Sequence, residues 1–349
     1  VWYDKPPLTY WALMITYKLF GVSDFTSRMP NTLIAGASVA LMYHLVFRIK
    51  HSTHLAVTSA ILLFSTLQFW YISHAIITDG FLFFFSLGIF GYSYLAFENR
   101  DRVSMVKAYV AAAFAVLTKG PVGIVLPGLI LLLFICMRWF AHRENADHHL
   151  ADDIQLLFNP LGLILFFIIG CPWYIAMYAI HGQDFITGFL GLHNIDRAIV
   201  SEHPKFNVWY YYIILIPLAL LPWTPAIIYR LKSISWKDNF DILGILWFAV
   251  IVVFYSMVAT KYITYTLLAI IPCIIWGAEA FITIINKNDK TFTYIISIPF
   301  FIYLGIFLTA SYTTPELWPA PLMITSVIIP LLLTVSKHFI KNLWQQTIY

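Results

Sequence analysis

The chain has 349 residues, of which 60% are hydrophobic and only 11% are charged. Soluble domains carry about 25% charged residues, so the composition excludes a soluble globular protein and indicates a multi-pass membrane protein. The net charge of +4 does not indicate a nucleic-acid partner, and the three cysteines lie far apart in apolar runs, without a disulfide or metal spacing.

The predicted elements begin with Leu8–Phe20, whose apolar and aromatic residues have helical spacing and could lie along the membrane interface. A bilayer span needs about 20 apolar residues. Eleven segments are candidates: Asn31–Phe47, Leu55–Ser73, Gly80–Phe97, Ala108–Thr118, Gly120–Met137, Leu157–Ala179, Val208–Tyr229, Ile242–Ala259, Tyr262–Ile284, Thr291–Ser311 and Ala320–Ser336. Ala108–Thr118 is too short to span alone unless flanking residues extend it. We expect an all-α, polytopic transmembrane helix bundle.

We expect a single transmembrane domain over residues 1–349. It divides into an outer loop (1–30), a first helix group (31–179), a large outer loop (180–207), a second helix group (208–336) and a cytoplasmic tail (337–349). Because the chain begins with Val1 in a polar loop, we expect a sequence truncated at its N-terminus.

The positive charges are distributed unequally between the two ends of the predicted spans. If the spans alternate, seven of the 21 Lys and Arg residues lie on the side of Val1–Pro30: Lys5, Lys18, Arg28, Lys119, Arg197, Lys205 and Lys261. Lys and Arg accumulate in cytoplasmic loops, so this side is predicted to face outward. Its two long loops, Val1–Pro30 and Ile180–Asn207, carry isolated charges among aromatics and prolines. Loops on a rigid scaffold often carry function, so we expect the functional face there.

The first candidate motif is Asp4-Lys5-Pro6-Pro7-Leu8. Two prolines restrict the backbone, so Lys5 is expected in a rigid turn. A lysine ammonium is suited to a phosphate oxygen. The alternative is an interfacial lysine whose charge reaches toward the lipid headgroups.

Two further charges stand alone beside apolar spans. Asp79 precedes the aromatic run Phe81–Phe85, where a carboxylate could act as a base, bind a metal or hold a hydroxyl; the alternative is a helix N-cap. Lys119 lies in a Gly/Pro break at membrane depth, and broken helices at that depth usually line a cavity. Its alternative is a short re-entrant turn whose lysine only reaches the surface.

Two pairs of residues have a spacing of four, which places each pair on one face of a helix. His193 and Arg197 could provide an imidazole for a divalent ion and a guanidinium for phosphate, although a single histidine is more often structural. Lys261 and Tyr265 could hold a lipid phosphate or serve as an interfacial anchor. The outer cations together indicate an anionic ligand, and no GxxxxGK[ST] motif for ATP is present.

These motifs, in this order, resemble the integral-membrane glycosyltransferases of the GT-C superfamily, in particular the bacterial aminoarabinose transferase and protein mannosyltransferase group. The resemblance covers about the first 275 residues. It is carried by Asp4-Lys5-Pro6-Pro7-Leu8 with Trp11, Lys18-Leu19-Phe20-Gly21, Ser27-Arg28-Met29-Pro30, Thr78-Asp79, Thr118-Lys119-Gly120-Pro121-Val122-Gly123, Gly188-Phe189-Leu190-Gly191-Leu192-His193-Asn194 with Arg197, Pro222-Trp223, and Lys261 with Tyr265 and Pro272.

The resemblance implies a site for a polyprenyl-phosphate donor. Lys5 and Arg197 would hold the phosphate, with Lys261 and Tyr265 nearby, and Asp4 and His193 match positions implicated in divalent-ion binding. Asp79 matches the acidic position of the second outer loop. The family's leading acidic motif, with its presumed catalytic carboxylate, is expected upstream of Val1, and Asp79 is the substitute base within this chain.

The activity implied is inverting sugar transfer from an undecaprenyl-phosphate type donor to a lipid A-like, glycan or protein acceptor at the outer face of the bacterial cytoplasmic membrane. A carboxylate would take the acceptor proton, and cations would stabilise the departing phosphate. A divalent metal ion is a candidate cofactor; no nucleotide or organic cofactor and no nucleic acid is expected. The alternatives are a transporter or flippase for a lipid-linked anion, and an inactive fragment that binds lipid.

Overall fold

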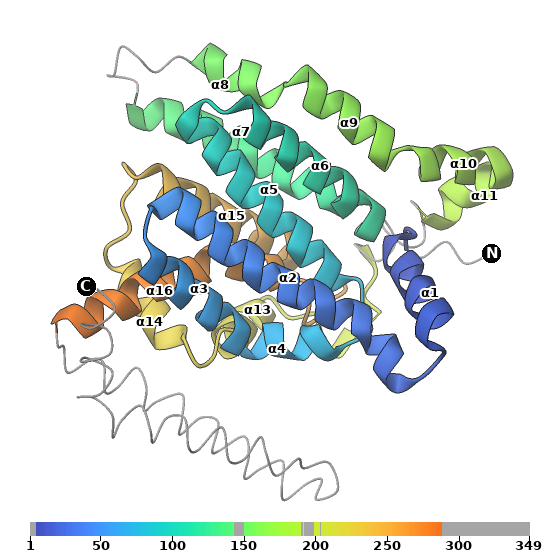
Figure 1. Ribbon diagram of the computed structural model, residues 1–349, viewed down its shortest axis with the longest axis horizontal. Coiled ribbons are helices and arrows are strands. Elements are labelled where there is room, and N and C mark those ends of the chain that lie inside the picture. The colour runs from blue at the N-terminus through green and yellow to red at the C-terminus, as the bar shows by residue number, and fades with distance from the viewer. Residues whose placement is uncertain (1–4, 143–149, 190, 192–198, 203, 288–349) are drawn as a thin grey trace, which may run out of the picture.

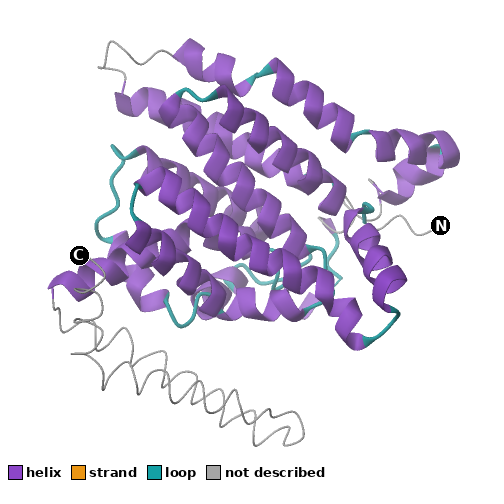
Figure 2. Cartoon of the chain, viewed as in Figure 1, coloured by secondary structure: helices purple, strands orange, loops and turns teal. Residues whose placement is uncertain are grey.

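The structure is a computed structural model, which describes residues 5–142, 150–189, 191, 199–202 and 204–287. Helices form the whole scaffold of these residues, and no strand occurs among them (Figures 1 and 2). Six of the described helices are long and apolar enough to cross a membrane, or up to eight if each of two bent pairs is one span. The predicted all-α, multi-pass architecture is confirmed, while the candidate spans Thr291–Ser311 and Ala320–Ser336 lie outside the described residues.

The N-terminal part contains two helices. Helix α1 (Leu8–Phe20) has the predicted bounds: it follows the proline pair and ends where Gly21, at φ +78°, turns the chain. Helix α2 (Asp24–Lys50) begins at a capping box in which Ser23 and Thr26 bond to each other's backbone N–H groups. It therefore starts well before the predicted span Asn31–Phe47, and residues 24–30 are helical rather than loop.

The next five helices form the centre of the bundle. They are α3 (Thr53–Ser65), α4 (Leu67–His74), α5 (Asp79–Asn99), α6 (Arg102–Lys119) and α7 (Val122–His142). The predicted span Leu55–Ser73 is a pair of helices bent by 63° at Thr66. Flanking residues lengthen the short segment Ala108–Thr118 into the 18 residues of α6. Helix α5 is largely buried and packs against both α2 and α6 (Figure 1).

The predicted span Leu157–Ala179 is wrong. This region contains α8 (Leu150–Leu157), α9 (Pro160–Gly170), α10 (Pro172–His181) and the short α11 (Gln183–Phe185). Asn159 accepts a hydrogen bond from the backbone N–H of Gly162, which caps α9, and Pro172 begins α10. The membrane-length segment is Leu150–Gly170. Apolar side chains favoured one continuous span, but the capping residues set the boundaries.

The C-terminal described part contains η2 (Pro204–Phe206), α13 (Tyr211–Ala219), α14 (Thr224–Leu231), α15 (Asn239–Met257), η3 (Leu267–Ala269) and α16 (Ile270–Lys287). The predicted span Val208–Tyr229 is a second bent pair: α13 and α14 meet at 111°, as a broken span or a re-entrant loop, with the cis Leu221–Pro222 bond between them. The predicted span Tyr262–Ile284 begins later, at η3.

The two breaks, between α3 and α4 and between α13 and α14, lie against each other. The backbone N–H of Leu67 donates to the carbonyl of Leu221 at 2.9 Å, and the indole N–H of Trp223 donates to the hydroxyl of Ser65 at 2.9 Å. Backbone groups freed within a membrane need partners inside the protein. Each break thus supplies partners to the other.

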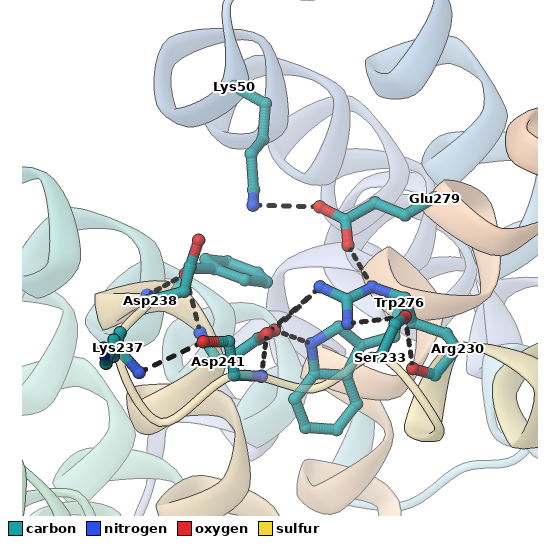
Figure 3. A network of polar contacts seen from close by, with 10 residues as sticks. Lys50, Arg230, Ser233, Lys237, Asp238, Asp241, Trp276 and Glu279 are labelled. Carbon is teal, nitrogen blue, oxygen red and sulfur yellow. Dashed lines mark hydrogen bonds and ion pairs between the residues drawn. The ribbon is translucent and has the colours of Figure 1, made fainter.

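One end of the bundle is held by a partly buried ionic network (Figure 3). Arg230 on α14 donates to Asp241 on α15 at 3.0 Å and to Glu279 on α16 at 2.8 Å. Lys50 on α2 pairs with Glu279 at 2.9 Å, and the indole of Trp276 donates to Asp241 at 3.0 Å. Because these charges satisfy one another, the network joins four helices without an unpaired buried charge.

Candidate functional site

At the end of the bundle away from the Figure 3 network, Asp79 at the start of α5 and Lys119 at the end of α6 form an ion pair. The Lys119 ammonium lies 2.6 Å from Asp79 Oδ1, and only 11% of either side chain is exposed. Thr78 occupies the N-cap position of α5, and Asp79 is the first residue of the helix. The N-cap alternative for Asp79 is therefore wrong, and Lys119 points inward rather than merely reaching the surface.

The turn between α6 and α7 aims Lys119 at this site. Gly120 has φ +79°, and a Cβ atom there would lie 2.9 Å from the ring of Phe189. A Cβ on Gly123 would lie 2.6 Å from the backbone carbon of Ala115. Both positions require glycine, one for its backbone angle and one for the close approach of the two helices. The sequence Lys119-Gly120-Pro121 therefore forms a tight reversal that ends α6 with its lysine directed inward.

Three tyrosines extend the ion pair into a cluster. The Lys119 ammonium lies 4.9 Å from the ring centroid of Tyr265. The ring of Tyr265 is 4.6 Å from that of Tyr255 on α15 and 5.2 Å from that of Tyr262. Asp79 also interacts electrostatically with Tyr255. Asp79, Lys119 and Tyr265, which come from three separate sequence motifs, thus share one site.

Lys261 lies beside this cluster, but its charge is directed at the backbone. Its buried ammonium donates to the carbonyls of Ser256 at 2.5 Å, Val258 at 2.6 Å and Tyr255 at 3.3 Å, around the C-terminus of α15. Cations are favourable at a helix C-terminus, where carbonyls lack intrahelical partners. Burial lowers the pKa of Lys261. Its predicted phosphate contact stays a prediction. In this structure the ammonium donates to backbone carbonyls.

Polar residues that the sequence analysis did not single out hold the site in place. The amide of Asn31 on α2 donates to the carbonyls of Ala75 and Ile77, and so fixes the segment before Asp79. The amide of Gln68 on α4 donates to the carbonyl of Ile263 at 2.6 Å, and so fixes the turn between Lys261 and Tyr265. A buried amide within an apolar helix needs a partner, and this is the signal that could have identified both.

Glu202 is another residue that the sequence analysis did not single out. Its carboxylate accepts the hydroxyl of Tyr262 at 2.6 Å, and its backbone N–H donates to the hydroxyl of Thr260. The Thr260 hydroxyl in turn donates to the carbonyl of Val200 at 3.1 Å. The segment before η2 is thereby tied to the turn that carries Lys261 and Tyr265.

The remaining predicted site residues cannot be placed with the same detail. Asp4, His193 and Arg197 lie outside the described residues. Lys5 is half-buried in the bend before α1. The described part of the chain contains no group of three or more His, Cys, Asp or Glu residues that could hold a metal ion. The metal ligands predicted at Asp4 and His193 therefore stay a prediction.

The cluster contains the chemical groups that an anionic ligand with a hydroxyl partner would need. The Lys119 ammonium and the Tyr265 phenol can each donate to an anionic oxygen, and donors fixed in advance stabilise developing charge. Asp79 can accept a proton or a hydrogen bond from a hydroxyl, with one oxygen already engaged by Lys119. The arrangement is suited to the transfer or binding of a phosphorylated ligand.

Comparisons with known proteins identify relatives of this chain. Residues 4–150 match the family model described as dolichyl-phosphate-mannose-protein mannosyltransferase. An uncharacterized protein of Aquifex aeolicus (strain VF5) is 30% identical over 261 residues, covering 74% of this chain and 56% of that protein. The undecaprenyl phosphate-alpha-4-amino-4-deoxy-L-arabinose arabinosyl transferase 1 of Proteus mirabilis (strain HI4320) is 26% identical over 297 residues, covering 83% of this chain and 51% of that protein.

The fold is also similar to a solved structure. The crystal structure of ArnT from Cupriavidus metallidurans bound to undecaprenyl phosphate superposes with a TM-score of 0.79 at 18% identity. The match covers 99% of this chain and 63% of that protein. At this identity the likeness shows a common fold. The chain spans about half the length of the curated relatives it matches.

Proposed function

We propose that this chain, a GT-C protein of the aminoarabinose and mannosyltransferase kind, takes part in sugar transfer from a polyprenyl-phosphate donor. The observation that carries the proposal is the convergence of Asp79, Lys119 and Tyr265 at one end of the bundle. Support comes also from relatives whose names specify an undecaprenyl-phosphate sugar, and from a common fold with a protein crystallised with undecaprenyl phosphate.

Cations and a phenol are proposed to hold the donor phosphate. Lys5 and Arg197 are the proposed direct contacts, with the Tyr265 hydroxyl as a further donor. Lys261 was predicted as another contact, but its three bonds to carbonyls favour a positioning role. It would fix the turn that carries Tyr265, as Gln68 does from the other side. The phosphate would leave with the polyprenyl chain, its charge stabilised by these donors.

Asp79 is the proposed acidic group for the acceptor. Attack of an acceptor hydroxyl on the anomeric carbon needs a base that removes its proton, and a single displacement inverts that carbon. Asp79 can assist through the oxygen that Lys119 does not engage. A divalent ion at Asp4 and His193 would add Lewis-acid assistance to phosphate departure. The steps assigned to the described residues do not need that ion.

The proposed setting is the bacterial cytoplasmic membrane, with about eleven spans and the Asp79 end facing outward. The support is the sequence pattern of cations, most of which fall at the other end. A lipid A-like, glycan or protein acceptor would approach from the outer side. Pocket shape and the residues between α11 and η2 would determine which acceptor and which sugar are used.

Binding of undecaprenyl phosphate tests this proposal. The purified chain in nanodiscs is incubated with undecaprenyl phosphate or with undecaprenol, which lacks the phosphate, and native mass spectrometry counts the retained lipid. We expect selective retention of the phosphate lipid, and loss of that selectivity in Lys5→Ala and Arg197→Ala. Lys18→Ala removes an exposed lysine from the same predicted side and serves as the matched control. Wild-type selectivity in both site variants would refute the phosphate site.

The same substitutions can be tested for catalysis in a longer protein that transfers sugar in liposomes. Lys5→Ala or Arg197→Ala should abolish transfer while the protein still elutes as a folded species. Full transfer by both variants would contradict the role given to these cations.

A further inference from the structure

Four cations at the end of the bundle that carries the Figure 3 network form ion pairs within the protein. Lys50 and Arg230 hold Glu279 and Asp241, while Arg100 and Arg138 hold Asp153 and Glu98. Arg48 and Lys107 are among the cations at this end for which the described residues provide no carboxylate within ion-pair distance. Both side chains are exposed.

These two cations converge with a histidine on one tyrosine. His44 and Arg48 lie one helical turn apart on the same face of α2. The Lys107 ammonium, on α6, lies 5.4 Å from the ring centroid of Tyr92 on α5. Arg48 and Lys107 both interact electrostatically with the His44 imidazole, and Arg48 does so with the Tyr92 hydroxyl. Three helices therefore contribute to one basic cluster, defined here as His44, Arg48, Tyr92 and Lys107.

Tight helix packing fixes the frame of the basic cluster. A Cβ atom on Gly88 of α5 would lie 3.3 Å from Ala111 on α6 and 3.9 Å from Leu41 on α2. A Cβ on Gly91 would meet the side chain of Leu45 at 2.5 Å. The three helices thus come together one turn before Tyr92. The cations project from this rigid contact and not from a loop.

One acidic residue, Asp101 at the N-cap of α6, interacts electrostatically with Lys107 of the basic cluster. Asp101 caps α6, and its oxygens accept the Val103 N–H at 2.9 Å and the Ser104 hydroxyl at 2.6 Å. The hydrogen bond from Ser104, with a smaller contribution from the Lys107 charge, lowers the pKa of Asp101. Its single charge is already used by the cap and cannot neutralise three basic side chains.

The basic cluster lies near the ends of two of its helices. Lys107 is five residues, or about 7.5 Å at 1.5 Å per residue, from the first residue of α6, and Arg48 is two residues from the last residue of α2. Exposed apolar side chains flank it: Tyr43 and Phe47 stack on α2 with centroids 6.3 Å apart, and Val103 on α6 is 62% exposed. In a bilayer these residues face acyl chains. A ligand here has an anionic head and an apolar body.

We propose that the basic cluster binds the phosphodiester of an anionic phospholipid in the leaflet opposite Asp79. The Arg48 guanidinium offers paired donors, Lys107 offers a point charge, and His44 and the Tyr92 hydroxyl complete the donor set. Basic sites between transmembrane helices are a known means of holding such headgroups. The site is separate from the sugar site and does not depend on sugar transfer.

Lipid retention by the purified chain tests this site. The chain in detergent is titrated with phosphatidylglycerol or with phosphatidylcholine, and native mass spectrometry measures the bound fraction. Each basic residue near a membrane surface contributes roughly fivefold in affinity, so Arg48→Gln with Lys107→Gln should weaken phosphatidylglycerol binding about thirtyfold. The matched control is Lys232→Gln with Lys237→Gln, which removes two exposed lysines from the same end. It should change binding less than threefold.

The proposal would be overturned by equal binding of the two lipids to the wild type, by wild-type binding in the Arg48/Lys107 variant, or by an equal loss in the control variant. Competition by millimolar inorganic phosphate at the same strength would assign the cluster to a free anion and overturn its assignment to lipid. Measuring undecaprenyl phosphate binding to the same variants distinguishes the basic cluster from the proposed sugar site. The Arg48/Lys107 variant should retain it, whereas Lys5→Ala should lose it and keep phosphatidylglycerol.

Discussion

Lys261→Met distinguishes a structural role of the Lys261 ammonium from direct contact with the donor phosphate. The substitution keeps the length of the side chain but removes three hydrogen bonds from a buried ammonium to the carbonyls at the end of α15. Hydrogen bonds from charged groups contribute about 1.5–3 kcal/mol each, and they are not additive because the freed carbonyls regain other partners. A total loss of about 3 kcal/mol in the free energy of unfolding follows.

Thermal unfolding in detergent measures this loss. At 2–4 °C per kcal/mol, the midpoint should fall by roughly 6–12 °C. Lys205→Met is the control, because Lys205 is an exposed lysine of the same region and should shift the midpoint by less than about 2 °C. A wild-type midpoint for Lys261→Met, together with loss of undecaprenyl phosphate binding, would refute the positioning role and restore the direct phosphate contact.

Two further predictions concern the turn and the ion pair of the same site. Gly120→Ala should destabilise the chain by about 2–4 kcal/mol, because φ is +79° and Phe189 occupies the space of a Cβ. Gly128→Ala, in open space on α7, is the control, and an equal loss of thermal stability in both would contradict this reason. Asp79→Asn and Lys119→Met should each cost about 3 kcal/mol. Their combination should cost about 1–3 kcal/mol less than the sum, and additive losses in a double-mutant cycle would argue against a coupled pair.

Local sequence signals determined the elements that were predicted correctly. Pro7 and Gly21 bound α1 on both sides, so its limits could be read directly. The chain from 157 to 179 was misassigned because hydropathy averages over a break. The Asn159–Pro160 and Cys171–Pro172 steps, which begin α9 and α10, are visible in the sequence but were outweighed by the apolar run around them. The bend at Leu221–Pro222 depends on contacts with the distant residues Ser65 and Leu67.

The site shows a similar division between local and tertiary information. Asp79, Lys119 and Tyr265 were identifiable because isolated polar groups beside apolar spans are costly without a role. Their pairing was not identifiable, because it depends on how α5, α6 and the turn before η3 pack. The roles of Asn31 and Gln68 depend on carbonyls that become neighbours only in the folded chain. For Lys261, the residue type suggested a phosphate ligand, whereas the structure directs its ammonium to a helix terminus.

The proposed sugar site requires that the Asp79 end of the bundle binds a polyprenyl phosphate through its phosphate group. The most direct measurement compares the binding of undecaprenyl phosphate and undecaprenol to the same purified chain by native mass spectrometry. We expect at least tenfold tighter binding of the phosphate lipid, and loss of that difference in Lys5→Ala and Arg197→Ala but not in Lys18→Ala. Equal binding of the two lipids by the wild-type chain would contradict it.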